Sequence, residues 1–173
     1  MQHIRRYKIF FIILCIILTG YLIPQRVAIP VKGASPRDWH PKSFWYYPWG
    51  KSITHKGVDI FAKEGTSVIS ATPGLVVYTG DMGRGGKVVL VLSSKWRIHY
   101  YAHLKEFKTS PLHFVNTGES VGTVGTTGNA EGKEPHLHYS IFSIIPLPWR
   151  IDSSIQGWLK MFFLNPIELM KEK

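Results

Sequence analysis

Between Gly57 and Phe142 the chain consists of short apolar runs separated by turn residues, and this pattern constrains the fold more than any other feature. The runs are rich in β-branched and aromatic side chains, which are typical of strands. Glycine, proline and asparagine fill the gaps, and no helical run of core length interrupts the series. We therefore predict an all-β fold built on an antiparallel sheet. Its expected strands are 57–61, 67–70, 75–78, 87–92, 97–104, 120–124 and 138–142.

The composition is that of one folded domain. The 173 residues are 45% hydrophobic and 13% aromatic, which is enough to bury a core, and 18% charged is too few for a disordered polyelectrolyte. This length allows one domain of ordinary size with about thirty further residues. Glycine and proline are spread along the chain, and this excludes coiled coils and helical solenoids.

The formal net charge of +10 is divided evenly along the chain. Residues 1–40 hold six Lys and Arg against one acid, and residues 41–173 hold fifteen against ten, so each part contributes +5. The folded part is thus mildly basic, which suits an anionic polymer such as a bacterial cell wall and general solubility about equally. No basic face interleaved with stacking aromatics and no reading motif is present, so we do not expect a nucleic-acid partner.

Residues 1–23 predict a membrane-directed segment. Arg5, Arg6 and Lys8 precede an apolar run over 9–23. The run would span roughly 22 Å as a helix, less than the ~30 Å hydrocarbon layer, so a cleaved signal peptide is an alternative. Because suitable small residues for cleavage are missing, an uncleaved transmembrane helix is favoured. We then expect a single-pass membrane protein with a cytoplasmic N-terminus and a catalytic domain in the periplasm or outside the cell.

Two segments separate this N-terminal run from the strands. Residues 24–43 are rich in proline, basic and small residues without a sustained period, and we interpret them as a linker. Residues 44–50 hold five aromatic side chains, which favour core lining over a lid on a cleft.

Histidine and aspartate recur at alternating positions of three expected strands. Residues of equal parity share one face of a strand, so such side chains can meet above a sheet. In the first run Gly57 would leave room between its neighbours. The three sets that share parity are His55 with Gly57 and Asp59, His99 with Tyr101 and His103, and His136 with His138 and Ser140.

Neutral imidazoles beside one carboxylate suit Zn²⁺, whose catalytic sites use three protein ligands and leave a position for water. A thiolate site is excluded because the only cysteine, Cys15, lies in the N-terminal apolar run. The chain has neither a His-Glu-x-x-His helix nor a Gly-x-Ser-x-Gly elbow, which excludes zincins and serine hydrolases. Each motif alone is weak, but their coincidence in one small β-rich domain favours a metal site.

Five motifs follow one another between residues 50 and 170. They are His55-Lys-Gly-Val-Asp59, Tyr101-Ala-His103-Leu, Gly122-Thr-Val-Gly125-Thr-Thr-Gly128, Pro135-His136-Leu-His138-Tyr and Asn165-Pro166. In order and spacing they resemble the lysostaphin-type zinc endopeptidases, which cut peptidoglycan peptides. The resemblance implies a zinc peptidase domain over 44–173 with a C-terminal extension over 144–173.

The resemblance also implies a role for each site residue. His55, Asp59 and His138 would bind Zn²⁺, and His103 and His136 would assist the metal-bound water and the transition state. Two histidines and one aspartate leave the site about one positive charge, which can lower the pKa of a bound water toward ~7.

The expected function is that of a membrane-tethered zinc endopeptidase. It would hydrolyse peptide cross-links of bacterial cell-wall peptidoglycan by attack of a zinc-bound water. The alternative is a non-catalytic module that binds peptidoglycan or activates other wall hydrolases, although the presence of all five site residues counts against it. Zymography with and without a chelator separates the two.

The chain departs from the family pattern in three places. Residues 49–54 replace a stretch that often carries a Gly-x-Arg motif, and Lys133-Glu134 lengthens the loop before the His-x-His motif. Residues 144–164 are an additional segment. Its apolar residues from Ile151 onward fit a short amphipathic helix that Asp152 or Ser153 could cap. Packing of this helix against the sheet is favoured, and membrane contact or a wall of the substrate cleft are the alternatives.

Overall fold

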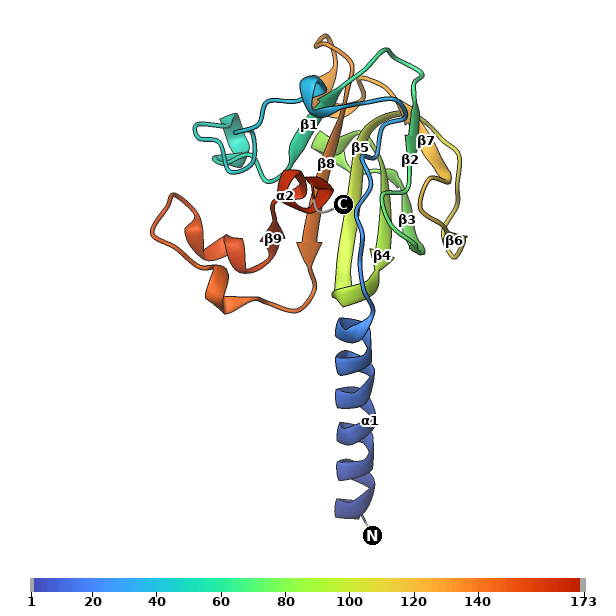
Figure 1. The fold of residues 1–173 in the computed structure, drawn as a ribbon, viewed down its shortest axis with the longest axis vertical. Coiled ribbons are helices and arrows are strands. Elements are labelled where there is room, and N and C mark those ends of the chain that lie inside the picture. Colours follow the sequence, from blue (N-terminus) through green and yellow to red (C-terminus); the bar gives the residue numbers. More distant parts are fainter. Residues whose placement is uncertain (1, 172–173) are drawn as a thin grey trace.

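A computed structural model describes residues 2–171 of the chain, with side chains over residues 6–170. Within this range one antiparallel sheet forms the body of the protein, and a long helix projects from one end of it (Figure 1). The helices are α1 (Gln2–Leu22) and α2 (Pro166–Lys171). The strands are β1 (Val58–Phe61), β2 (Ser67–Ile69), β3 (Gly74–Asp81), β4 (Lys87–Ser93), β5 (Arg97–Phe107), β6 (Phe114–Val115), β7 (Ser120–Val124), β8 (His136–Ser143) and β9 (Phe163–Leu164).

The sheet confirms the all-β, antiparallel prediction. Its main path runs β1-β8-β5-β4-β3-β6, β7 pairs with β2 and β5, and β9 pairs with β8. All seven expected runs are strands with bounds that shift by a few residues. The two-residue strands β6 and β9 were not expected, because so short a segment carries no alternation that a sequence can reveal.

Alternation along β8 shows how the sequence divides core from site. Leu137, Tyr139 and Ile141 are fully buried in the core, and His136 and His138 lie on the opposite face. Burying a large apolar side chain of this kind contributes roughly 1.5–3 kcal/mol. The same arrangement recurs on the neighbouring strands, and the core includes Val58, Ile60, Val76, Val89, Val91, Tyr101 and Leu104.

Residues 24–43, expected as a linker, are packed against the domain. Val27, Val31 and Trp39 are buried in the core, and Val31 forms an isolated antiparallel bridge with Val68 of β2. The Ala28 amide donates to a backbone carbonyl, that of Ala71, over 2.8 Å. An irregular segment with scattered apolar residues can thus cover an exposed strand without any period of its own.

The amphipathic helix expected from Ile151 onward is absent from the described residues, and that prediction is wrong. Residues 144–164 instead hold two short 3₁₀ turns, Pro148–Arg150 and Gly157–Met161, and only the second lies within the expected helix. Gln156 has a left-handed backbone with φ +56°, which interrupts any helix at this point. Ile151 and Trp158 are exposed instead of packing on the sheet.

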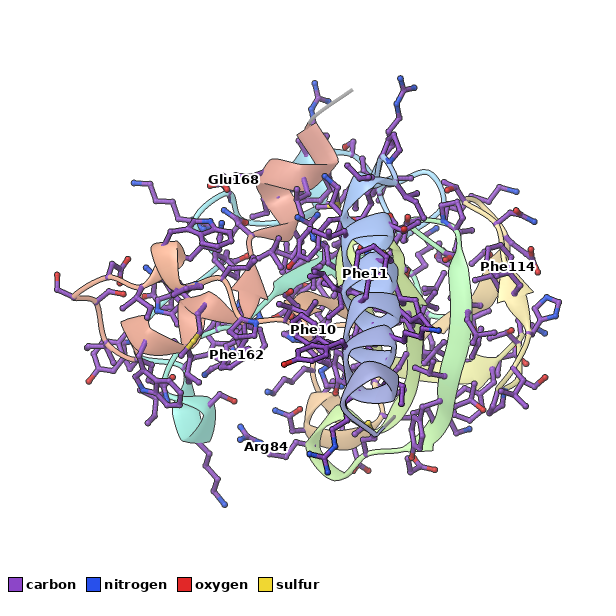
Figure 2. All side chains as sticks on the ribbon, turned by 90° about the horizontal axis from the view of Figure 1, so that it is seen from below. Phe10, Phe11, Arg84, Phe114, Phe162 and Glu168 are labelled. Carbon is purple, nitrogen blue, oxygen red and sulfur yellow. The ribbon has the colours of Figure 1, made fainter. Side chains whose placement is uncertain are left out.

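Helix α1 touches the body of the protein at the turn between β4 and β5. There the Trp96 indole donates a hydrogen bond to the Ile17 carbonyl over 3.0 Å. Phe10 and Phe11 project from the helix and are about two-thirds exposed, at 66% and 65% (Figure 2). Among the described residues no helix combines the length and the apolar character needed to cross a membrane. The transmembrane helix expected in residues 1–23 is therefore not supported by the fold.

His99 of β5 is fully buried between the sheet and the segment that follows α1. The Gln25 side-chain amide donates to its Nε2 over 3.2 Å, so the ring proton is on Nδ1, which lies 2.5 Å from the Tyr139 hydroxyl. Burial, aided by the charge of Arg97, lowers the pKa of His99 to about 3. The ring is therefore neutral in the folded protein over the physiological pH range.

This burial predicts an acid-sensitive fold. The unfolded chain binds a proton at His99 near pH 6.5, whereas the folded chain does so only near pH 3, so stability falls as the pH drops through this window. The contribution reaches about 1.4 kcal/mol per pH unit. Urea unfolding of the metal-free protein between about pH 7 and pH 4 should show a weaker pH dependence for His99→Gln than for the wild type. An identical pH dependence in both proteins would contradict the assignment.

Candidate metal centre

Strands β1 and β8 bring three potential metal ligands together. Asp59 and His138 are direct partners in the antiparallel register, and His55 lies just before β1. Gly57 allows this approach, because a Cβ there would lie 2.5 Å from both the Ser140 hydroxyl and a backbone carbonyl. The missing side chain at Gly57 thus makes room for β8.

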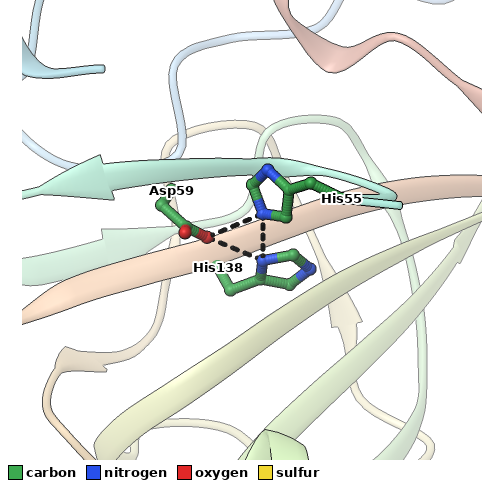
Figure 3. Close-up of side chains that lie close together, drawn as sticks. All are labelled: His55, Asp59 and His138. Carbon is green, nitrogen blue, oxygen red and sulfur yellow. Dashed lines mark hydrogen bonds and ion pairs between the residues drawn. The ribbon is translucent and has the colours of Figure 1, made fainter. Parts of the chain in front are cut away.

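The three side chains direct one atom each to a common point (Figure 3). His55 Nε2 lies 3.1 Å from both Asp59 Oδ1 and His138 Nδ1, and His138 Nδ1 lies 2.7 Å from Asp59 Oδ1. Ligands of a tetrahedral ion at about 2.0–2.1 Å would be separated by roughly 3.3 Å. The observed separations are close to the edges of such a tetrahedron.

The opposite nitrogen of each imidazole determines where its proton is. His55 Nδ1 lies 2.9 Å from the Ser43 carbonyl, which only accepts, so this nitrogen carries the hydrogen and Nε2 has a lone pair. For His138 the partner is Ser140, whose hydroxyl donates to the Lys56 carbonyl over 2.7 Å. The Ser140 oxygen can therefore accept from His138 Nε2 over 3.0 Å, which leaves the lone pair on Nδ1.

Two lone pairs and a carboxylate oxygen thus face one another. Burial lowers the pKa of His138, so this ring does not readily take up a second proton that could bridge the three atoms. The donor set fits a cation with nitrogen and oxygen ligands, as Zn²⁺ has in proteins.

His103 reaches the same cleft by a backbone irregularity. It has φ +63°, and the register of β5 shifts immediately after it, between Leu104 and Glu106. The expected common face of His99, Tyr101 and His103 is therefore wrong. His99 and Tyr101 point into the core, whereas His103 turns to the face that lines the cleft.

His103 and His136 stand beside the three-residue cluster as a second pair. Their ring centroids are 5.1 Å apart, and that of His103 is 6.0 Å from the ring of His138. Each Nδ1 faces a backbone carbonyl, Thr127 at 2.8 Å for His103 and Glu134 at 2.7 Å for His136. Both Nδ1 atoms therefore carry hydrogen, and each Nε2 keeps a lone pair. Burial, aided by His138, lowers the pKa of His103 to about 4.

A comparison with known families matches this site. The sequence profile of peptidase family M23 fits residues 53–145, which include both histidine pairs and Asp59. The chain belongs to peptidase family M23.

Two further similarities fall in the same region. The DD-carboxypeptidase/endopeptidase Mpg of Neisseria meningitidis is 36% identical over 85 residues, which are 49% of this chain and 19% of that protein. The catalytic domain of lysostaphin from Staphylococcus simulans has a TM-score of 0.60 at 24% identity, over 75% of this chain and 90% of that domain. The chain therefore spans about a fifth of its curated relative, and its fold matches most of the lysostaphin catalytic domain.

A second similar structure is a zinc-containing peptidase of Vibrio cholerae. Its TM-score is 0.55 at 23% identity, over 68% of this chain and 37% of that one. At this identity the likeness shows a common fold.

Asp59 and His138 of the three-residue cluster line a cavity of about 420 Å³. Trp49 forms one wall and stacks on His55 with ring centroids 4.1 Å apart, so part of segment 44–50 faces a cleft. Lys133, in the lengthened loop before β8, also lines the cavity, as does Ala130. Two departures from the family pattern thus lie at the cleft.

Two cleft residues were missed by the sequence reasoning. Tyr100 packs edge-on against His138 with ring centroids 6.1 Å apart, and Arg84, in the turn between β3 and β4, lines the cleft. Strand alternation places Tyr100 on the face opposite His99 and Tyr101, which is the face toward the cleft. The sequence did not reveal this, because the backbone irregularity at His103 is not visible in it. For Arg84 the only signal was a cation within a glycine-rich turn.

Proposed function

We propose that the chain is a zinc endopeptidase that hydrolyses peptide bonds of bacterial cell-wall peptidoglycan. The observation that carries this proposal is the convergence of three atoms, His55 Nε2, Asp59 Oδ1 and His138 Nδ1, none of which carries a proton. His103 and His136 line the same cleft. Membership of peptidase family M23 and the printed activity of the Neisseria relative support the reaction class.

His55, Asp59 and His138 would hold the ion. Zinc bound there would supply Lewis-acid polarisation of the scissile carbonyl and would lower the pKa of a water molecule. The chain keeps its own ligands in the required state, because hydrogen bonds fix the tautomer of each ring and burial keeps His138 neutral. Outer hydrogen bonds of this kind orient metal ligands and increase their basicity.

His103 and His136 are the candidates for proton transfer. Their Nδ1–H groups are engaged with carbonyls, so only Nε2 is available to a reacting group. A neutral imidazole can accept a proton from the attacking water there and return it to the departing amine. The left-handed backbone of His103 directs its ring to the cleft.

The cleft suits an extended peptide that carries negative charge. Arg84 and Lys133 are the cations among the described residues that line it, and Asp59, the acid that lines it, belongs to the metal cluster. Trp49 adds an aromatic wall. Cell-wall peptides with free carboxylates would therefore meet a complementary surface.

Hydrolysis of defined cell-wall peptides tests the proposal. Purified protein with one equivalent of zinc should release fragments that mass spectrometry identifies, and a chelator should abolish the release. His103→Ala and His136→Ala should keep nearly full zinc content but lose at least ~100-fold in turnover, because acid–base assistance is worth roughly 10² to 10⁴. His138→Ala should lose the zinc itself.

The two classes of variant differ in two independent measurements, zinc content and turnover. Binding to peptidoglycan without any fragment release from the zinc-loaded wild type would favour a regulatory module instead. Zinc loss in His136→Ala but not in His138→Ala would reverse the two roles within the His-x-His motif. Full activity in both His103→Ala and His136→Ala would exclude the imidazole mechanism.

The domain is proposed to work outside the cytoplasm, where peptidoglycan is located. Attachment to the membrane through residues 1–23 is part of this proposal and rests on the sequence pattern alone, the basic Arg5, Arg6 and Lys8 before an apolar run. Cell fractionation with N-terminal sequencing should find an intact chain in the membrane fraction. A soluble mature protein that lacks the run would identify a signal peptide, and recovery from the cytoplasm would contradict the location.

A further inference from the structure

The loop between β8 and β9 reaches back to the segment that carries His55. Most of this loop, residues 146–162, follows the part of the chain that matches peptidase family M23. Two backbone hydrogen bonds close its base. The Ser143 amide donates to the Phe162 carbonyl over 2.7 Å, and the Leu147 amide donates to the Met161 carbonyl over 2.8 Å. Its tip, residues 152–157, lies beside Thr54 and Lys56, the residues before and after His55.

The Gln156 side chain joins this tip to the two residues that flank His55. Its Oε1 accepts one hydrogen bond from the Thr54 hydroxyl and one from Lys56 Nζ, both at 2.8 Å. Thr54 is fully buried, and Lys56 Nζ also donates to the Ser52 carbonyl over 2.9 Å. One amide oxygen thus joins the two neighbours of His55.

The other side of His55 is held by the aromatic segment. The Trp45 amide donates to the His55 carbonyl over 2.7 Å, and the His55 amide donates to the Tyr46 carbonyl over 3.0 Å. The Trp45 indole donates in turn to the Ile155 carbonyl at the loop tip, over 3.0 Å. His55 therefore lies in a strip of chain that is fixed from both sides, although it precedes the regular pairing of β1.

The loop tip is itself constrained to present Gln156. The Asp152 carboxylate accepts from the Ser154 amide over 3.0 Å and also binds Lys160, which closes the tip on itself. Gly157 is required there, because a Cβ would lie 2.2 Å from the Asp152 carbonyl. Gln156 keeps a left-handed backbone, φ +56°, that a residue with a side chain seldom adopts. Such a conformation persists only where surrounding contacts determine it.

We infer that Gln156 is a positioning residue for the metal ligand His55. It acts through Thr54 and Lys56, whose hydrogen bonds to one oxygen fix the chain on both sides of the histidine before any ion binds. A metal site that is ordered in advance binds more tightly, because less conformational entropy is lost when the ligands converge. The inference rests on the proposed metal site and adds to it a residue outside the family M23 match.

Zinc affinity of the full chain tests this role directly. Competition with a chelating dye should show a zinc Kd for Gln156→Ala about tenfold or more above that of the wild type, since outer partners of metal ligands contribute roughly 10- to 100-fold. Gln156→Glu keeps an acceptor oxygen at the same reach, so its Kd should remain within about threefold of the wild type. Ser153→Ala is the matched control, because it changes an exposed residue of the same tip.

Thermal unfolding of the metal-free proteins separates positioning from general stability. A purely structural role would lower the melting temperature of Gln156→Ala and leave the zinc Kd within twofold of the wild type, and that result would overturn the inference. Should Gln156→Ala fail to fold, Thr54→Val removes the same hydrogen bond from the other side, and an unchanged Kd there would also overturn it. A wild-type protein that binds no zinc would instead refute the proposed metal site.

Discussion

The organisation of this protein depends on three acceptor atoms that are held together without a proton to share. Hydrogen bonds to the Ser43 carbonyl and the Ser140 hydroxyl place the ring protons of His55 and His138 on the outer nitrogens. The inner nitrogens then face the Asp59 carboxylate at 2.7 to 3.1 Å. Lone pairs at this separation repel unless a cation lies between them, so the sheet must supply the energy that keeps them in place.

The sheet meets this requirement through the pairing of β1 with β8. Asp59 and His138 are direct register partners, and a slip of one residue would turn one of them into the core. Gly57 lets the chain before β1 pass within contact distance of β8, so that His55 can join the pair. The remaining side of His55 is bounded by segment 44–50 and by the loop tip that carries Gln156. His55 lies outside regular structure, but contacts on both sides thereby hold it in place.

Much of this architecture could be predicted from local pattern. Alternation located the strands and placed His136 and His138 on one face of β8, because parity is a local property of a strand. It failed at His103, where a left-handed residue and a register shift turn the ring away from the core. It also failed for the segment after Ile151, which looked helical by apolar spacing. There the conformation is determined by tertiary contacts of Gln156 and Gly157, which spacing does not encode.

The tautomers of His55 and His138, the two histidines of the proposed metal site, test the central claim most directly. Nitrogen-15 NMR of the imidazoles should show hydrogen on Nδ1 of His55 and on Nε2 of His138. One equivalent of Zn²⁺ should then shift Nε2 of His55 and Nδ1 of His138, the two nitrogens that face Asp59. Coordination through the same type of nitrogen in both rings, or no shift in either ring, would contradict the account.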